Sequence, residues 1–64
     1  MKLYVPIPGC VKFCKIVDNN EYLQKVLEQD RNSISVWYIR AGADMAELRR
    51  ILVGNRIKYQ IKET

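Results

Sequence analysis

Apolar and polar residues alternate in three segments of the chain, which is the pattern of a β-strand with one buried face. These segments are residues 2–7, 33–40 and 56–62, and the second is rich in β-branched and aromatic side chains. Two prolines in and after the first segment lack N–H donors, so its later part should lie at an edge or bend away. Pro8-Gly9 then predicts a turn.

Two helices are indicated by acidic start signals that precede apolar residues at helical spacing. Asp18 stands three residues before Glu21, and Asp44 three residues before Glu47. In this acidic variant of the capping box, the first carboxylate accepts from unpaired backbone N–H groups at the helix start. The second carboxylate accepts from the backbone N–H of the first residue. We expect the first helix to span residues 19–29, and the second to follow Asp44 and end at Gly54. Their predicted buried sides are Tyr22, Leu23, Val26 and Leu27 in the first, and Met45, Leu48, Ile51 and Leu52 in the second.

The segment 10–17 is compatible with either type of element. As a helix it gathers Cys10, Phe13, Cys14 and Val17 on one face, whereas its β-branched and aromatic content favours a strand. The helix fits slightly better, because a strand would place one lysine on each face. The predicted order is therefore β-α-α-β-α-β. The alternative is β-β-α-β-α-β, with a hairpin that turns at residues 6–9.

The fold class predicted from these elements is a small α/β (α+β) domain over residues 1–64. A three- or four-stranded sheet forms a single layer, and two or three helices pack on one face, because strands that alternate belong to sheets with one open face. The side chains expected to face the helices are Leu3, Val5, Ile34, Val36, Tyr38, Ile57, Tyr59 and Ile61. The open face is expected to carry Lys2, Tyr4, Ser33, Ser35, Trp37, Arg56, Lys58, Gln60 and Lys62.

Length and charge narrow the class of partner. A chain of 64 residues has room for one thin core, so a partner or a second copy would add stability. The net charge is +4, and residues 1–30 sum to zero, so the whole excess lies in residues 31–64. Such asymmetry favours an anionic partner, although a basic excess of this size also serves solubility alone.

The residue types that most often carry catalysis and metal binding are missing. The chain has no histidine, and its three glycines are isolated, so we expect no catalytic residue, no cofactor and no metal site. Cys10 and Cys14 are best explained as reduced core side chains, and a thiol-redox role for them is a remote alternative. With no apolar run long enough for a membrane span and no secretory signal, we expect a cytoplasmic protein that does not contact membranes.

A non-enzymatic interaction module is the function that this pattern favours. The candidate binding residues are Lys2, Tyr4, Trp37, Arg40, Arg56, Lys58 and Lys62. The leading hypothesis is a regulatory or inhibitory module that contacts a protein, or a second copy in a homodimer, through the open sheet face. The alternative is binding of single-stranded RNA or DNA, with Trp37 and Tyr4 stacking on bases and the cations holding phosphates. We identify no family, because this order of strands and helices is common to many unrelated small domains.

Overall fold

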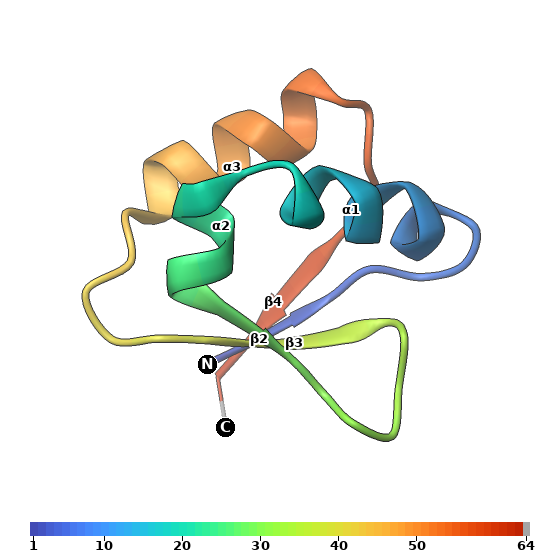
Figure 1. Cartoon of the computed structure of the whole chain (residues 1–64), viewed down its shortest axis with the longest axis horizontal. Helices are drawn as coiled ribbons and strands as arrows, with labels where there is room; N and C mark the ends of the chain where they lie inside the picture. The colour runs from blue at the N-terminus through green and yellow to red at the C-terminus, as the bar shows by residue number, and fades with distance from the viewer. Residues whose placement is uncertain (64) are drawn as a thin grey trace.

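Three helices cover one side of a four-stranded antiparallel sheet, and the other side of the sheet has no layer over it (Figure 1). The computed structural model describes residues 1–63. Along the chain its elements are β1 (Lys2–Tyr4), α1 (Gly9–Asp18), α2 (Glu21–Val26), β2 (Leu27–Gln29), β3 (Val36–Ile39), α3 (Met45–Gly54) and β4 (Gln60–Lys62).

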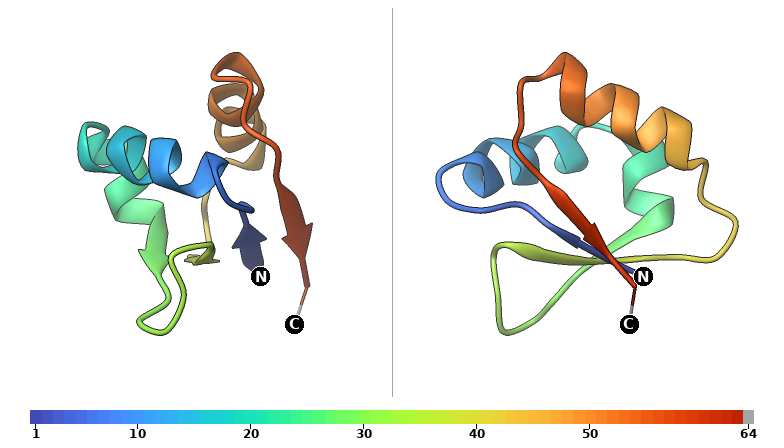
Figure 2. Two further views of the ribbon diagram at one scale, coloured as in Figure 1. Left: turned by 90° about the vertical axis from the view of Figure 1, so that its right-hand side faces the viewer. Right: turned by 180° about the vertical axis from the view of Figure 1, so that it is seen from behind.

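The sheet has the strand order β2-β3-β1-β4, and every neighbouring pair is antiparallel. Two β-α-β units interleave in this order, which is the split β-α-β arrangement. Figure 2 shows the helices on the same side of the sheet from two further directions. The predicted fold class and the order β-α-α-β-α-β are confirmed, with β2 as an additional short strand. Within residues 1–63, no helix is long and apolar enough to cross a bilayer.

The core lies between the sheet and the helices. Leu3 of β1 pairs with Trp37 of β3 on one side and with Ile61 of β4 on the other, so these side chains share the covered face. The ring of Phe13 on α1 meets the Trp37 indole edge-on, with centroids 4.9 Å apart. The buried apolar residues are Leu3, Val5, Cys10, Phe13, Leu23, Leu27, Trp37, Leu48, Leu52 and Ile57.

The predicted helix over residues 19–29 is too long. α2 ends at Val26, and Leu27–Gln29 forms β2, which pairs with β3. The ladder continues on both sides, because Asp30 N–H donates to Val36 O at 2.9 Å and Arg40 N–H donates to Val26 O at 2.8 Å. Pairing with the next strand along the chain therefore overrides the local helical pattern, and Leu27 is buried in a strand rather than in a helix.

The start of α2 also differs from the prediction. Asp18 is the last residue of α1, and the side chain of Asn20 accepts the Leu23 N–H at 3.1 Å as the N-cap of α2. The Gln24 amide then donates to the backbone carbonyls of Val17 and Asp18, at 3.1 and 2.8 Å, and satisfies the end of α1. The cap on α3 is confirmed, since Asp44 accepts from the N–H groups of Ala46 and Glu47. The second half of the predicted pattern is wrong, because Glu47 pairs with Arg50 and the Asp44 N–H donates to the Tyr22 hydroxyl.

All three predicted strands are longer than the observed ones. β1 ends at Tyr4, before the prolines, and β3 begins only at Val36. Arg56 has a φ of +56° and lies in the turn that ends α3, so it cannot belong to a strand. Its N–H donates to Val53 O, and the next N–H, of Ile57, donates to Leu52 O, both at 3.0 Å. These two bonds form a Schellman turn, which leaves β4 to begin at Gln60.

The ambiguous segment 10–17 is helical and lies within α1. Cys10 is fully buried in the core, but Cys14 is only half-buried, and Gln29 places its amide nitrogen 3.5 Å from the Cys14 sulfur. The expectation that both thiols are core side chains therefore holds fully for Cys10, whereas Cys14 packs against the core from its margin. Both cysteines are free.

Candidate functional site

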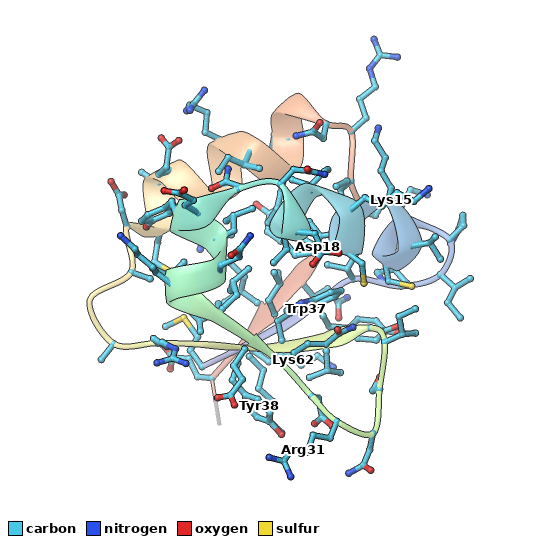
Figure 3. The ribbon with its side chains drawn as sticks, viewed as in Figure 1. Lys15, Asp18, Arg31, Trp37, Tyr38 and Lys62 are labelled. Carbon is cyan, nitrogen blue, oxygen red and sulfur yellow. The ribbon has the colours of Figure 1, made fainter. Side chains whose placement is uncertain are left out.

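The predicted phase of the third alternating segment is wrong. Trp37 is only 2% exposed, whereas its neighbour Tyr38 is 40% exposed. Figure 3 shows the Trp37 ring on the helix side of the sheet and Tyr38 on the far side. Because side chains alternate with a period of two, one misassigned residue moves every side chain of a strand to the other face. Val36 and Tyr38 therefore face away from the helices, and Trp37 cannot serve as an exposed binding residue. In the turn before β3 the prediction is wrong as well, because Ile34 is exposed and Ser35 is buried.

The uncovered side of the sheet carries two rows of four side chains, which we call the exposed face. Strand register aligns the first row as Glu28, Tyr38, Lys2 and Lys62, from β2 to β4. The second row is Asp30, Val36, Tyr4 and Gln60, where Asp30 follows β2 directly. Of the predicted binding residues, the structure brings Lys2, Tyr4 and Lys62 together on this face.

Two tyrosine rings are the main apolar surface of the exposed face. Tyr38 stands on β3 and Tyr4 on β1, the two central strands, and Tyr4 is 37% exposed. Each ring has a lysine ammonium above it: Lys2 Nζ lies 5.4 Å from the Tyr38 centroid, and Lys62 Nζ lies 5.5 Å from the Tyr4 centroid. These cation–π contacts hold both lysines flat against the sheet.

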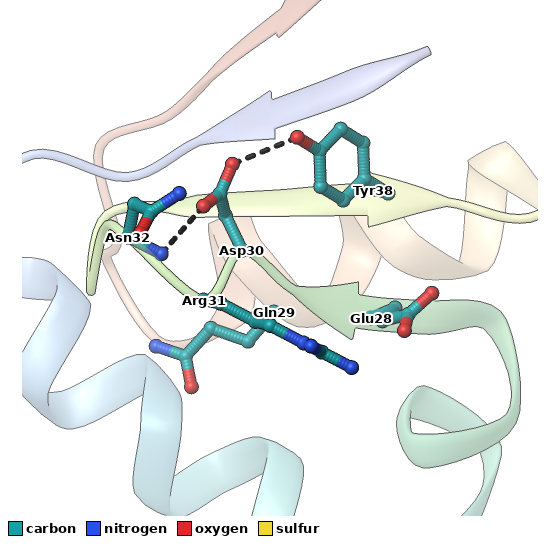
Figure 4. Close-up of a pocket in the computed structure, with 6 residues that line it drawn as sticks. All are labelled: Glu28, Gln29, Asp30, Arg31, Asn32 and Tyr38. Carbon is teal, nitrogen blue, oxygen red and sulfur yellow. Dashed lines mark hydrogen bonds between the residues drawn. The ribbon is translucent and has the colours of Figure 1, made fainter.

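A hydrogen-bonded pair orders one corner of the exposed face (Figure 4). The Tyr38 hydroxyl donates to Asp30 Oδ2 at 2.7 Å, and the Asn32 backbone N–H donates to Asp30 Oδ1, also at 2.7 Å. The bond from Asn32, then the bond from Tyr38 and the charge of Lys2, lower the pKa of the Asp30 carboxyl. The same hydroxyl bond raises the pKa of Tyr38, because ionisation would remove the donated proton and place two anions side by side. Asp30 is therefore an anion at neutral pH and Tyr38 a neutral donor.

The β2 end of this corner is hollowed. A depression of about 280 Å³ lies among Glu28, Gln29, Asp30, Arg31, Asn32 and Tyr38. Arg31 stands in the loop between β2 and β3 and reaches beyond the sheet on the same side as Tyr38 (Figure 3). The depression is shallow, and polar side chains line it. It is therefore better suited to contact a side chain of a partner protein than to enclose a small molecule.

Charge is divided between the two halves of the exposed face. Glu28 and Asp30 lie at the β2 edge, whereas Lys2 and Lys62 lie on β1 and β4. The four formal charges cancel, so this face lacks the uniform positive potential that a phosphate backbone requires. Its pattern is that of a surface which complements another surface of mixed charge.

The remaining predicted binding residues lie elsewhere. Arg40 directly follows β3, at the opposite end of that strand from Asp30. Arg56 and Lys58 lie in the loop between α3 and β4 and border a separate hollow beside α1. The residues that the prediction missed on the exposed face are Tyr38, Val36, Glu28 and Asp30. A signal for Tyr38 was present, because two adjacent aromatic residues must point to opposite faces of a strand.

No family model, no curated protein and no solved structure matches this chain. Among residues 1–63, no group of three or more cysteine, aspartate or glutamate side chains is placed to hold a metal ion. The split β-α-β arrangement hosts many unrelated functions, so function here has to be inferred from the side chains on the exposed surface.

Proposed function

We propose that this chain is a small non-enzymatic interaction module, which binds protein through the exposed face of its sheet. The observation that carries the proposal is the pair of exposed tyrosines between an acidic and a basic edge. Tyrosine is enriched at protein interfaces, where its ring supplies contact area and its hydroxyl a hydrogen bond. The surrounding charges set orientation and partner choice.

A second copy of the chain is the partner that this charge pattern complements. A two-fold axis along the strands, between β3 and β1, exchanges β2 with β4 and keeps the two rows in register. It lays Glu28 over Lys62 of the second copy, and Tyr38 over Lys2. Aligned face-to-face packing of two sheets has this geometry, and it covers the side of the sheet that the helices leave open.

A charge-swap experiment tests this arrangement. Glu28→Lys and Lys62→Glu each place like charges opposite one another, so each single variant should weaken self-association. The double variant restores opposite charges and should recover it. The measurement is sedimentation velocity over a concentration series up to about 1 mM, where even an association near −4 kcal/mol is visible. Arg49→Glu on the exposed side of α3 is the control for a change of net charge.

Two results contradict the proposal. If the chain remains monomeric over the whole series, the second copy is not the partner. If the double variant associates as weakly as the single variants, the charges on this face do not meet across an interface.

Binding of single-stranded nucleic acid is the second candidate, and the exposed rings on the two central strands favour it. Stacked bases on aromatic side chains, beside lysines, are a common mode of single-strand recognition. It ranks second because Glu28 and Asp30 share the face and each ring already carries a lysine above it. Titration with oligothymidylate distinguishes the two functions: base stacking should shift the ring resonances of Tyr4 and Tyr38, and added salt should reverse the shift.

A thiol-redox function has less support. Cys10 is fully buried in the core, so an external thiol or disulfide cannot reach its sulfur without opening the fold.

A further inference from the structure

Two hollows border α1, and neither is lined by a residue of the two rows of the exposed face. The first, of about 290 Å³, lies between the turn at residues 6–9 and the loop at residues 56–58. The second, of about 360 Å³, lies along α1 beside Lys15. Lys12 borders both hollows, so they are neighbouring parts of one surface.

This surface is uniformly basic. Four cations line it, Lys12, Lys15, Arg56 and Lys58, and no acidic side chain lines either hollow. Among residues 1–63, the salt bridge present joins Arg50 to Glu47 on α3 and involves none of the four. Lys12 Nζ donates to the backbone oxygen of Asn55 at 2.9 Å, which fixes this cation at the end of α3, between the two hollows. None of the four cations that define this basic surface therefore forms a salt bridge within the described residues.

Apolar side chains stand among the cations. Ile7 is 73% exposed and lines the first hollow together with Pro6 and Pro8, and Ile16 lines the second. The first hollow therefore presents apolar side chains and cations side by side. A partner that suits both properties has negative charge and apolar side chains together.

The geometry points to a second binding site on the basic surface, which takes an acidic segment of a partner protein with apolar side chains between its carboxylates. Carboxylates would pair with Lys12, Lys15, Arg56 and Lys58, while an apolar side chain packs on Ile7 and the prolines. A nucleic acid fits less well, because no aromatic ring lines either hollow and base stacking has no platform.

The site is independent of the exposed face. Figure 3 shows Lys15 on α1 in the helical layer, with Tyr38 on the far side of the sheet. None of the four cations belongs to the two rows of the exposed face, so variants at each surface test the two proposals separately.

The probe is a short synthetic peptide in which glutamates alternate with leucines, titrated into the isotope-labelled chain and followed by NMR. The expected result is a shift of the amide resonances of Lys12, Lys15, Arg56 and Lys58, with those of Tyr4 and Tyr38 unmoved. Binding should weaken as salt is added, because exposed ion pairs are screened. A peptide with glutamines in place of the glutamates should not bind.

Variants test whether these cations are the contacts. Arg56→Gly with Lys58→Gln should reduce affinity for the glutamate–leucine peptide at least about tenfold, by removing two charge-assisted contacts. Glycine suits the left-handed backbone at position 56, so a loss of binding cannot be attributed to misfolding. The matched control is Arg49→Gln with Lys25→Gln, which removes two exposed cations from α3 and α2 and should leave the affinity within about twofold.

Three outcomes overturn the inference. Equal loss in the two double variants would mean attraction to net charge alone. Equal binding of the glutamine peptide would exclude recognition of carboxylates. Tighter binding of oligothymidylate at the same amides would assign the surface to nucleic acid.

Discussion

The indole ring of Trp37 lies edge-on to the phenyl ring of Phe13, with their planes at 86° and their centroids 4.9 Å apart. This contact joins the central strand β3 to α1, and both side chains are at most 2% exposed. Edge-to-face aromatic pairs add to the stability that burial alone provides. Trp37 is thus an anchor of the core, while the adjacent Tyr38 faces the solvent.

Trp37 and Tyr38 should therefore respond very differently to truncation. Trp37→Ala leaves a large cavity and should lower the free energy of unfolding by about 3–5 kcal/mol, whereas Tyr38→Ala should cost about 1 kcal/mol or less. Urea denaturation followed by far-ultraviolet circular dichroism measures both, because it does not depend on the tryptophan signal. Similar losses in the two variants would contradict the burial of one ring and the exposure of the other.

Adjacent aromatic residues explain why sequence could predict the existence of this strand but not its phase. Val36, Trp37, Tyr38 and Ile39 are all compatible with a core, so either alternate pair can face the helices. The choice depends on what fills the space opposite, and Phe13 of α1 and Leu3 of β1 complete a pocket for the larger ring. That information is spread over distant segments of the chain.

The helices α2 and α3 were predictable from their apolar spacing and start signals, whereas α1 was only slightly favoured over a strand, and the exact helix ends were harder to predict. Asp44 caps α3 as its pattern predicts, whereas the same pattern at Asp18 is not used. Once α1 extends to Asp18, that residue stands at a helix C-terminus and Asn20 becomes the first residue able to cap α2. The cap pattern could not reveal that the preceding helix runs through it.

Alanine substitution of the three polar residues at these helix ends should change the free energy of unfolding by different amounts. Asn20→Ala and Asp44→Ala each remove a cap and should each cost about 1 kcal/mol. Asp18→Ala should cost nothing, or raise stability by a few tenths of a kcal/mol, because a carboxylate at a helix C-terminus opposes the helix dipole. Thermal unfolding of the three variants tests this order, and a larger loss for Asp18→Ala than for Asn20→Ala would show that Asp18 is the cap.

The hydrogen bond from Tyr38 to Asp30 gives the exposed face a specific pH dependence. Its loss in Tyr38→Phe should raise the pKa of Asp30, though not to the ordinary value, because the Asn32 N–H still donates to the carboxylate. The folded pKa of Asp30 lies below the unfolded value of about 3.9, so its stabilising contribution is present at neutral pH and is lost as pH falls below that value. An NMR titration of the Asp30 side chain measures the shift, and an unchanged pKa in Tyr38→Phe would exclude the bond.

Arg56 connects the stability of the chain with the basic surface. Its φ of +56° is unfavourable for a residue with a Cβ, and glycine adopts it readily, so Arg56→Gly should raise the free energy of unfolding by about 1 kcal/mol. Asn55→Gly is the control one position earlier: Asn55 has a φ of −98°, and its amide donates to Ile51 O at 2.8 Å, so this change should destabilise. Urea denaturation of both variants measures whether each change raises or lowers the free energy of unfolding.

An Arg56→Gly variant that is less stable would show that the arginine side chain supports the Schellman turn. An increase would show that arginine costs stability at this position, which is expected where a side chain serves binding.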